Sequence, residues 1–194
     1  MFWIKLKDLY KKNVVLAEEY SFEEYYPLLR RFIAREVNLG SEYLSPYRFS
    51  LYYGISPGKS IRLFLGLADN PEIIRTCFKY QCEECDSINI IEDEKDLLEF
   101  SCYECGFEDS LATPDYFSEV KVIFKISYEI LEEFKEDLKE NPLSNNESNS
   151  TALEEGIDVD VSFEAVGELN GLEDKIIGED FEARVRNILM GDIL

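Results

Sequence analysis

Residues 82–105, CEECDSINIIEDEKDLLEFSCYEC, decide the fold of the central part of the chain. Cys82 and Cys85 form one Cys-x-x-Cys pair, sixteen residues follow, and Cys102 and Cys105 form a second pair. A Cys-x-x-Cys turn lets two thiolates reach one ion at tetrahedral angles, and the intervening arm brings the second turn back to that ion. We therefore expect the four sulfurs to bind a single metal ion.

The spacing is that of a zinc ribbon, in which short strands carry the two turns. Four thiolates leave no position for water, so one structural Zn²⁺ is expected, which would hold the fold and not catalyse. Gly106 suits the sharp turn under the second pair, and Asp86 stands in the equivalent place after the first. Short strands are expected at Phe78–Gln81, Ser87–Ile91, Leu97–Ser101 and Phe107–Leu111.

Other interpretations of the cysteines stay open at the level of sequence. A rubredoxin-like iron site uses the same four ligands, although its turns usually carry more glycine. Two disulfides are disfavoured in a reducing compartment, and a redox Cys-x-x-Cys motif usually occurs once. The fifth cysteine, Cys77, lies in an apolar-leaning stretch and is expected to be a buried structural thiol.

Composition narrows the classes of function. The 194 residues include 41 acidic and 20 basic side chains, a net charge of −21, and no histidine. Ser-His-Asp triads, Cys-His pairs and imidazole acid–base chemistry are therefore excluded, and we expect no enzyme. Residues 1–81 carry 12 basic and 9 acidic side chains (+3), whereas residues 82–194 carry 8 and 32 (−24). Such asymmetry favours two regions with different partners.

The chain shows no targeting or membrane-spanning pattern. Lys5 interrupts the apolar run at the start, so a signal-peptide core is lacking. No window approaches the 18 apolar residues that span a membrane. We therefore expect a cytoplasmic protein with neither a membrane partner nor a small-molecule substrate.

A pair of helix starts precedes the cysteines. Ser45-Pro46 and Ser56-Pro57 each place a capping hydroxyl before a proline at the first helical position. Gly54 between them can adopt the positive φ that ends the first helix. These signals predict a helix-turn-helix over residues 45–68.

The residue types on the second helix of this pair indicate whether the partner is DNA or protein. Its apolar stripe is expected to be buried, and Lys59, Arg62 and Gly66 are expected on the other side. Lys59 and Arg62, with Arg48 nearby, are the candidate contacts to nucleic acid or to a partner. The helix is apolar nearly all round, which favours packing against protein over base readout. The stripe consists of Ile61, Phe64, Leu65 and Ala68.

The flanking segments fit a winged helix over residues 21–81. Ser21 to Glu24 forms a capping box before an apolar helix in which Pro27 is tolerated only in the first turn. After the pair, Asn70-Pro71 breaks the helix and residues 72–81 are rich in β-branched and aromatic side chains, as expected of a wing.

The C-terminal part combines a strand, an acidic helix and a linker. Residues 116–126 alternate like a strand, residues 127–140 form an amphipathic acidic helix, and residues 157–163 alternate again. Residues 179–194 show helical spacing of apolar side chains, which predicts a helix that closes on its own domain or lies in a partner's groove. This candidate docking helix carries Phe181, Val185, Ile188 and Leu189.

The predicted fold class is α+β. It comprises a helical winged helix-turn-helix module (1–77), a zinc ribbon (78–112), a strand with an acidic helix (113–140), a linker (141–152) and an acidic segment ending in a helix (153–194). The C-terminal region as a whole is expected to be an acidic α/β region.

This order of modules, with the turns Cys82-Glu-Glu-Cys85 and Cys102-Tyr-Glu-Cys105, resembles archaeal transcription factor E and its eukaryotic relative. It is also similar to winged-helix/zinc-ribbon adaptors of bacterial multi-protein systems, including defence operons. The resemblance implies an adaptor or regulatory subunit that docks protein partners in a complex. The alternative is a DNA-binding transcription regulator that uses the helix-turn-helix at 45–68, with weak DNA contact through residues 1–81.

Overall fold

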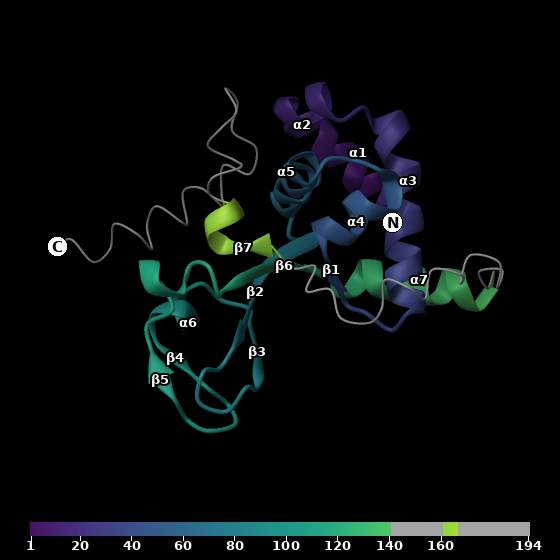
Figure 1. Cartoon of the computed structure of the whole chain (residues 1–194). Coiled ribbons are helices and arrows are strands. Elements are labelled where there is room, and N and C mark those ends of the chain that lie inside the picture. Colours follow the sequence, from purple (N-terminus) through teal and green to yellow (C-terminus); the bar gives the residue numbers. More distant parts are fainter. Residues whose placement is uncertain (141–160, 167–194) are drawn as a thin grey trace.

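The computed structural model describes residues 1–140 and 161–166. It combines helices with a mixed set of short and long strands, which confirms the α+β class (Figure 1). The elements are α1 (Phe2–Lys12), α2 (Val14–Glu19), α3 (Phe22–Asn38), β1 (Tyr43–Leu44), α4 (Pro46–Tyr53), α5 (Pro57–Ala68), β2 (Ile74–Gln81), β3 (Ile88–Ile91), α6 (Lys95–Leu98), β4 (Phe100–Ser101), β5 (Glu108–Asp109), the 3₁₀-helix η1 (Pro114–Tyr116), β6 (Lys121–Ile126), α7 (Tyr128–Glu140) and β7 (Val161–Ser162).

An antiparallel sheet joins segments that lie far apart in the sequence. Its order is β1-β6-β2-β3, and β7 pairs with β6 beyond the end of β1. β2 and β6 pair over their length, with Ile74 opposite Ile126 and Lys79 opposite Lys121. The strand that follows the cysteines therefore lies beside the strand that precedes them. β4 and β5 form a separate two-stranded sheet.

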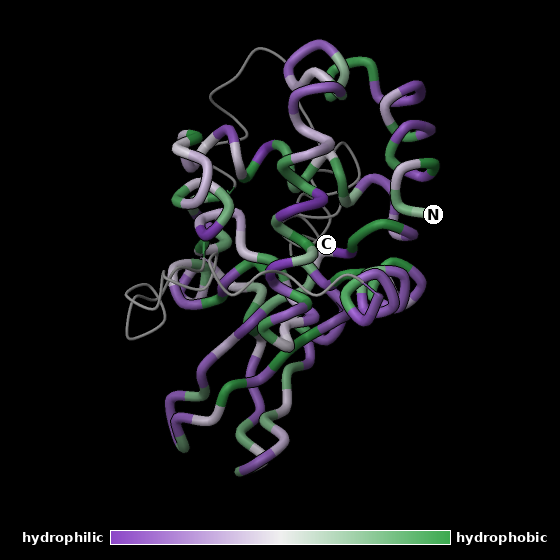
Figure 2. Tube along the Cα trace, turned by 90° about the vertical axis from the view of Figure 1, so that its right-hand side faces the viewer, coloured by the Kyte–Doolittle hydropathy of each residue, from purple (hydrophilic) through white to green (hydrophobic). Residues whose placement is uncertain are grey.

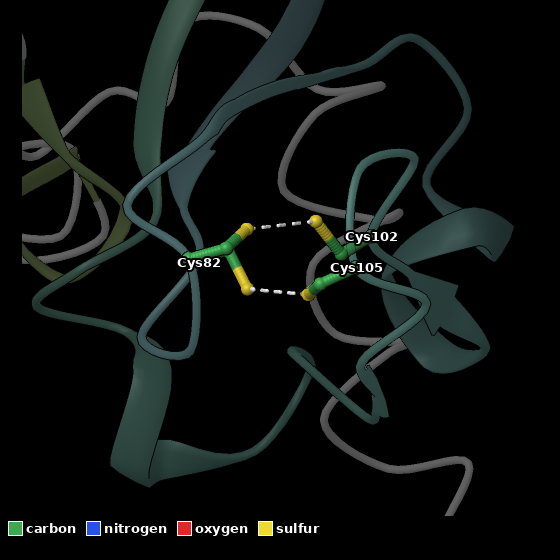
Figure 3. A group of neighbouring side chains, drawn as sticks. Cys82, Cys102 and Cys105 are labelled. Atoms are coloured by element: carbon green, nitrogen blue, oxygen red, sulfur yellow. Dashed lines mark hydrogen bonds between the residues drawn. The ribbon is translucent and has the colours of Figure 1, made fainter.

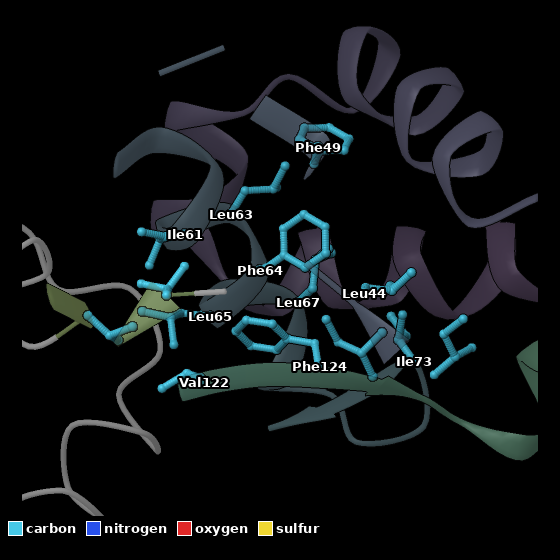
Figure 4. Packing of buried hydrophobic residues seen from close by; sticks show 14 of the residues in the cluster. Leu44, Phe49, Ile61, Leu63, Phe64, Leu65, Leu67, Ile73, Val122 and Phe124 are labelled. Atoms are coloured by element: carbon cyan, nitrogen blue, oxygen red, sulfur yellow. The ribbon is translucent and has the colours of Figure 1, made fainter. Parts of the chain in front are cut away.

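Helices α1 to α5 lie on one side of the large sheet, and the core fills the space between them and the sheet (Figure 1). α5 packs over β2 and β6, and Phe64 of α5 meets Phe124 of β6 at a ring distance of 5.5 Å (Figure 4). Phe32 of α3 and Phe49 of α4 stack edge-on against each other and against Phe64. All four rings are fully buried, so three helices and the sheet share one aromatic cluster.

The local helix signals are confirmed. Ser45 and Ser56 cap α4 and α5, and a proline stands at the first position of each helix. Gly54 ends α4 with φ of 63° and ψ of 28°, a left-handed conformation that glycine adopts without steric cost. Ser21 caps α3 as the capping box predicts.

Four expected features differ in the structure. Of the strand expected at residues 116–126, only Lys121–Ile126 is extended, and Tyr116 ends the 3₁₀-helix η1. The strand expected at residues 97–101 begins as the helix α6, and only Phe100–Ser101 are extended. Pro27 is the sixth residue of α3, past the first turn to which it was assigned. β2 is not an isolated wing, because β6 and β3 flank it on both sides.

The acidic helix α7 closes the body against α1 and α3. Its N-terminal half forms ion pairs with the start of the chain: Glu133 pairs with the N-terminal ammonium, and Glu129 pairs with Lys5 of α1. Within the described residues, none of the helices combines the length and apolar character that crossing a membrane requires. The expected linker, most of the strand at 157–163 and the candidate docking helix lie outside the described residues.

Candidate metal centre

The structure brings Cys82, Cys85, Cys102 and Cys105 together. Their four sulfurs all lie within 4.8 Å of one another. Sγ of Cys82 is 3.7 Å from that of Cys105, and Sγ of Cys85 is 3.7 Å from that of Cys102 (Figure 3). Each short distance therefore joins one Cys-x-x-Cys turn to the other.

The two turns, here called knuckles, have the same backbone path. In the first knuckle (82–87) the N–H of Cys82 donates to the carbonyl of Ser87, and the N–H of Asp86 donates to the carbonyl of Cys82. In the second (102–107) the N–H of Cys102 donates to Phe107, and that of Gly106 donates to Cys102. The knuckles extend the β2–β3 and β4–β5 hairpins, so paired strands fix both.

One position of this path requires a left-handed backbone. Gly106 has φ of 73°, and Asp86 in the matching position has φ of 59°. Among the described residues, Asp86 is the one non-glycine residue with positive φ. Aspartate tolerates this conformation better than most residues with a Cβ, so the knuckle closes without glycine.

Two polar side chains, one in β3 and one just before it, lie next to the sulfurs. The Ser87 hydroxyl lies 3.0 Å from Sγ of Cys85 and 3.1 Å from Sγ of Cys102. The buried Asn89 amide donates to Sγ of Cys102 at 3.6 Å and accepts from the N–H of Tyr103 at 3.2 Å. Backbone N–H donation from Cys105 and the Ser87 hydroxyl lower the pKa of Cys102 to about 5.

The four sulfurs fit one tetrahedral metal ion. A metal–sulfur bond of about 2.3 Å gives a tetrahedron with edges of about 3.8 Å, close to the two short distances above. Hydrogen bonds to Sγ of Cys102 favour its charged form, which is the form that binds metal. Burial raises the pKa of the Cys82 thiol, which must therefore lose its proton when a metal ion binds. Cys82 and Cys102 are buried, whereas Cys105 is exposed. Four thiolates on one tetrahedral ion would leave no coordination position for water.

The fifth cysteine lies apart from this cluster. Cys77 is 1% exposed on β2, as the sequence predicts. Burial raises the pKa of its thiol to about 11, so the thiol stays protonated at neutral pH.

The candidate contacts of the helix pair do not form one surface. Arg62 has a side chain only 4% exposed, and its Nη2 lies 2.8 Å and 3.0 Å from the two carboxylate oxygens of Glu19. Arg62 and Gly66 were expected on the side of α5 opposite the buried stripe, but this side is buried as well, because α5 is buried continuously from Ser60 to Leu67.

Arg48 and Lys59 differ from Arg62 in exposure. Nη1 of Arg48 lies 3.2 Å from Oε2 of Glu36, whose side chain is 1% exposed, so Arg48 neutralises a buried carboxylate of α3. Lys59 is exposed at the start of α5, and its backbone carbonyl accepts from the hydroxyl of Tyr20. Of the three cations, Lys59 alone is exposed.

Sequence reasoning missed the residues that support these groups. Ser87 and Asn89 act on the sulfurs, and Glu19 and Glu36 neutralise arginines. Alternation along β3 gave no signal for Asn89, because isoleucines stand on both faces of this strand. Glu19 carries no local signal, since its partner lies 43 residues further along the chain.

The segment with Phe181, Val185, Ile188 and Leu189 lies outside the described residues. Comparisons of the chain with protein-family models, with curated proteins and with solved structures give no match. What the structure itself establishes is an α+β chain with a four-cysteine cluster able to hold a metal ion.

Proposed function

We propose that this protein is a non-enzymatic adaptor or regulatory subunit that docks protein partners in a multi-protein complex. In this proposal the ion is one structural Zn²⁺, and residues 78–112 are a zinc ribbon attached to a helical module of the helix-turn-helix kind. The complexes of transcription and of bacterial defence are the settings in which the resembling proteins work.

The enclosure of α5 is the observation that carries the proposal. A helix that reads DNA presents cations and amide side chains to the groove. In α5, eight consecutive residues from Ser60 to Leu67 are buried, and Arg62 binds Glu19 within the protein. The helix is thus part of the protein's own core, and its buried face is not available to a DNA groove. This supports protein docking over DNA binding.

The surface of the four-cysteine lobe, defined here as residues 82–111, also supports a protein partner. The lobe carries 11 acidic side chains and one basic side chain, a net charge of −10. A charge of this sign repels the phosphate backbone of nucleic acids. Large apolar side chains are exposed on the same lobe, namely Ile88, Ile90, Leu98 and Tyr103. An acidic surface with exposed apolar groups suits a partner protein better than a polyanion.

The proposal is tested by measuring DNA binding of the full chain over a range of salt concentrations. We expect no affinity for a short duplex beyond weak, sequence-independent attraction, and no change in a Lys59→Ala variant. Affinity that falls steeply with salt and disappears in Lys59→Ala would contradict the adaptor and support the DNA-binding alternative.

A second measurement tests complex formation directly. The chain, expressed at its natural level in its host, should migrate on size exclusion as part of a larger, salt-sensitive assembly with defined stoichiometry. Migration of the whole population as a free monomer would contradict the proposal. Cys85→Ser provides the matched variant, and it should leave the assembly if the zinc-held lobe is a docking element.

A further inference from the structure

β3 is an edge strand of the large sheet. It pairs with β2 on one side, and among the described residues no strand pairs with its other side. Figure 1 shows β3 on the side of the lobe that faces away from β4 and β5. An unpaired edge presents backbone N–H and C=O groups that can bind another strand.

The register shows which residues present these groups. The N–H of Cys82 donates to the carbonyl of Ser87, so Cys82 and Ser87 are a hydrogen-bonded pair. Hydrogen-bonded and non-hydrogen-bonded pairs alternate in an antiparallel ladder. The pair of Tyr80 and Asn89 is then hydrogen-bonded, whereas Ile88 and Ile90 stand opposite Gln81 and Lys79 in non-bonded pairs. Ile88 and Ile90 therefore direct their N–H and C=O groups toward the free edge.

The side chains of the same two residues are exposed. Ile88 is 53% exposed and Ile90 is 40% exposed, whereas the alternate residues Asn89 and Ile91 are buried. Natural edge strands are commonly protected by lysine, proline or a bulge, and β3, with the sequence INII, has no lysine or proline. The strand thus offers apolar contact together with backbone pairing.

Acidic residues flank this strand at both ends. Residues 83–86 precede it with three acidic side chains, and residues 92–94 follow it with three more. Glu92 pairs with Lys125, and the others belong to the lobe that holds 11 acidic residues against one basic residue. A segment that pairs with β3 would lie between two clusters of negative charge. Figure 2 shows hydrophilic (purple) and hydrophobic (green) positions interspersed in the lobe at the bottom of the view.

We propose that the free edge of β3 binds an extended, basic segment of a partner protein by strand addition. This inference rests on the proposed adaptor function and names the chemistry of the partner. Ile88 and Ile90 supply four backbone groups and two apolar side chains, and the flanking carboxylates attract lysine or arginine on either side of the paired residues. An acidic segment is repelled by the same charges.

The test uses a synthetic peptide of about ten residues, which matches β3 with its flanks. Valine and threonine alternate in its centre, and two lysines stand at each end. Binding to the full-length, metal-loaded protein is measured by fluorescence anisotropy. We expect saturable binding that weakens as sodium chloride rises from about 0.05 M to about 0.5 M, because salt screens exposed charges.

Two peptide controls separate backbone pairing from charge. Methylation of the central amide nitrogens removes their N–H donors without changing the charge, and we expect it to weaken binding about tenfold or more. Replacement of the four lysines by glutamate should abolish binding. Equal binding of either control peptide would overturn the proposal.

Two protein variants separate the contribution of the backbone donors from that of the apolar side chains. Ile90→Pro removes an outward N–H without removing a bond of the β2–β3 ladder, so the protein should keep its metal and its thermal stability and lose the peptide. Ile88→Thr with Ile90→Thr keeps the backbone donors and should lose part of the affinity. Full binding by metal-loaded Ile90→Pro would overturn the proposal whatever the other variants do.

Failure of this inference is distinguishable from failure of the adaptor function. If the native assembly forms equally with wild type and Ile90→Pro, the adaptor stands and the β3 edge is not its docking site. If no assembly forms with wild type, the adaptor function itself fails.

Discussion

Asp86 and Gly106 show how strongly a single backbone angle governs the knuckles. Both have positive φ, and both donate their N–H to the first cysteine of their own knuckle. A Cβ added at Gly106 would meet no atom within 4 Å, so space does not restrict that position. Steric strain within the residue itself is therefore what distinguishes glycine from aspartate there.

Adding a Cβ at Gly106 and removing the side chain of Asp86 should change the stability of the protein in opposite directions. Gly106→Ala should destabilise the metal-loaded protein by about 1 kcal/mol, because alanine is strained at positive φ. Asp86→Gly should stabilise it by about 0.5 kcal/mol, since relief of strain exceeds the extra entropy of the unfolded glycine. Urea unfolding of the two variants measures both changes. A neutral Gly106→Ala together with a destabilised Asp86→Gly would contradict this account.

The clustering of the four cysteines was predictable from the sequence because it depends on spacing within one short stretch. The position of Gly106 was predictable for the same reason. The support from Asn89 was not predicted, because it depends on which face of β3 turns toward the second knuckle. That face is set only when the two hairpins come together.

At the scale of elements, α5 shows which features local sequence patterns predict and which they do not. Its start, its cap and the glycine before it follow from Ser56, Pro57 and Gly54, which act within a few residues. Its enclosure on every side could not be predicted, because the strand beneath it, β6, lies more than fifty residues further along the chain. An apolar stripe reports that one face is buried, but it says nothing about what covers the opposite face.

The ion pair of α5 gives a prediction at this scale. Glu19→Gln removes the carboxylate that neutralises the buried Arg62, and it should destabilise the protein by about 2 kcal/mol. The value lies below the range for fully buried pairs because the Glu19 side chain is 30% exposed. Lys59→Ala on the same helix is the control, and it should change stability by less than about 0.5 kcal/mol. Denaturant unfolding compares them, and equal effects would show that Arg62 does not depend on Glu19.

At the scale of the whole molecule, the sheet unites regions that the sequence pattern divides. β2 belongs to the mildly basic part, and β3 and β6 belong to the acidic part, yet all three share one ladder. The charge boundary at residue 82 therefore coincides with the first knuckle and not with a break in the fold. The four-cysteine lobe extends from the end of β2, so a metal ion bound by the cysteines would stabilise a projection of the same body (Figure 1).

The central claim is that Cys82, Cys85, Cys102 and Cys105 bind one zinc ion that holds this lobe. It is tested by elemental analysis of the protein purified under reducing conditions, with the reactive thiols counted before and after chelation. We expect about one zinc per chain, since four thiolates bind one ion. Four thiols should become reactive on chelation, and the metal should be lost in Cys82→Ser and in Cys105→Ser. Protein that carries no metal, or that keeps its metal in both variants, would contradict the account.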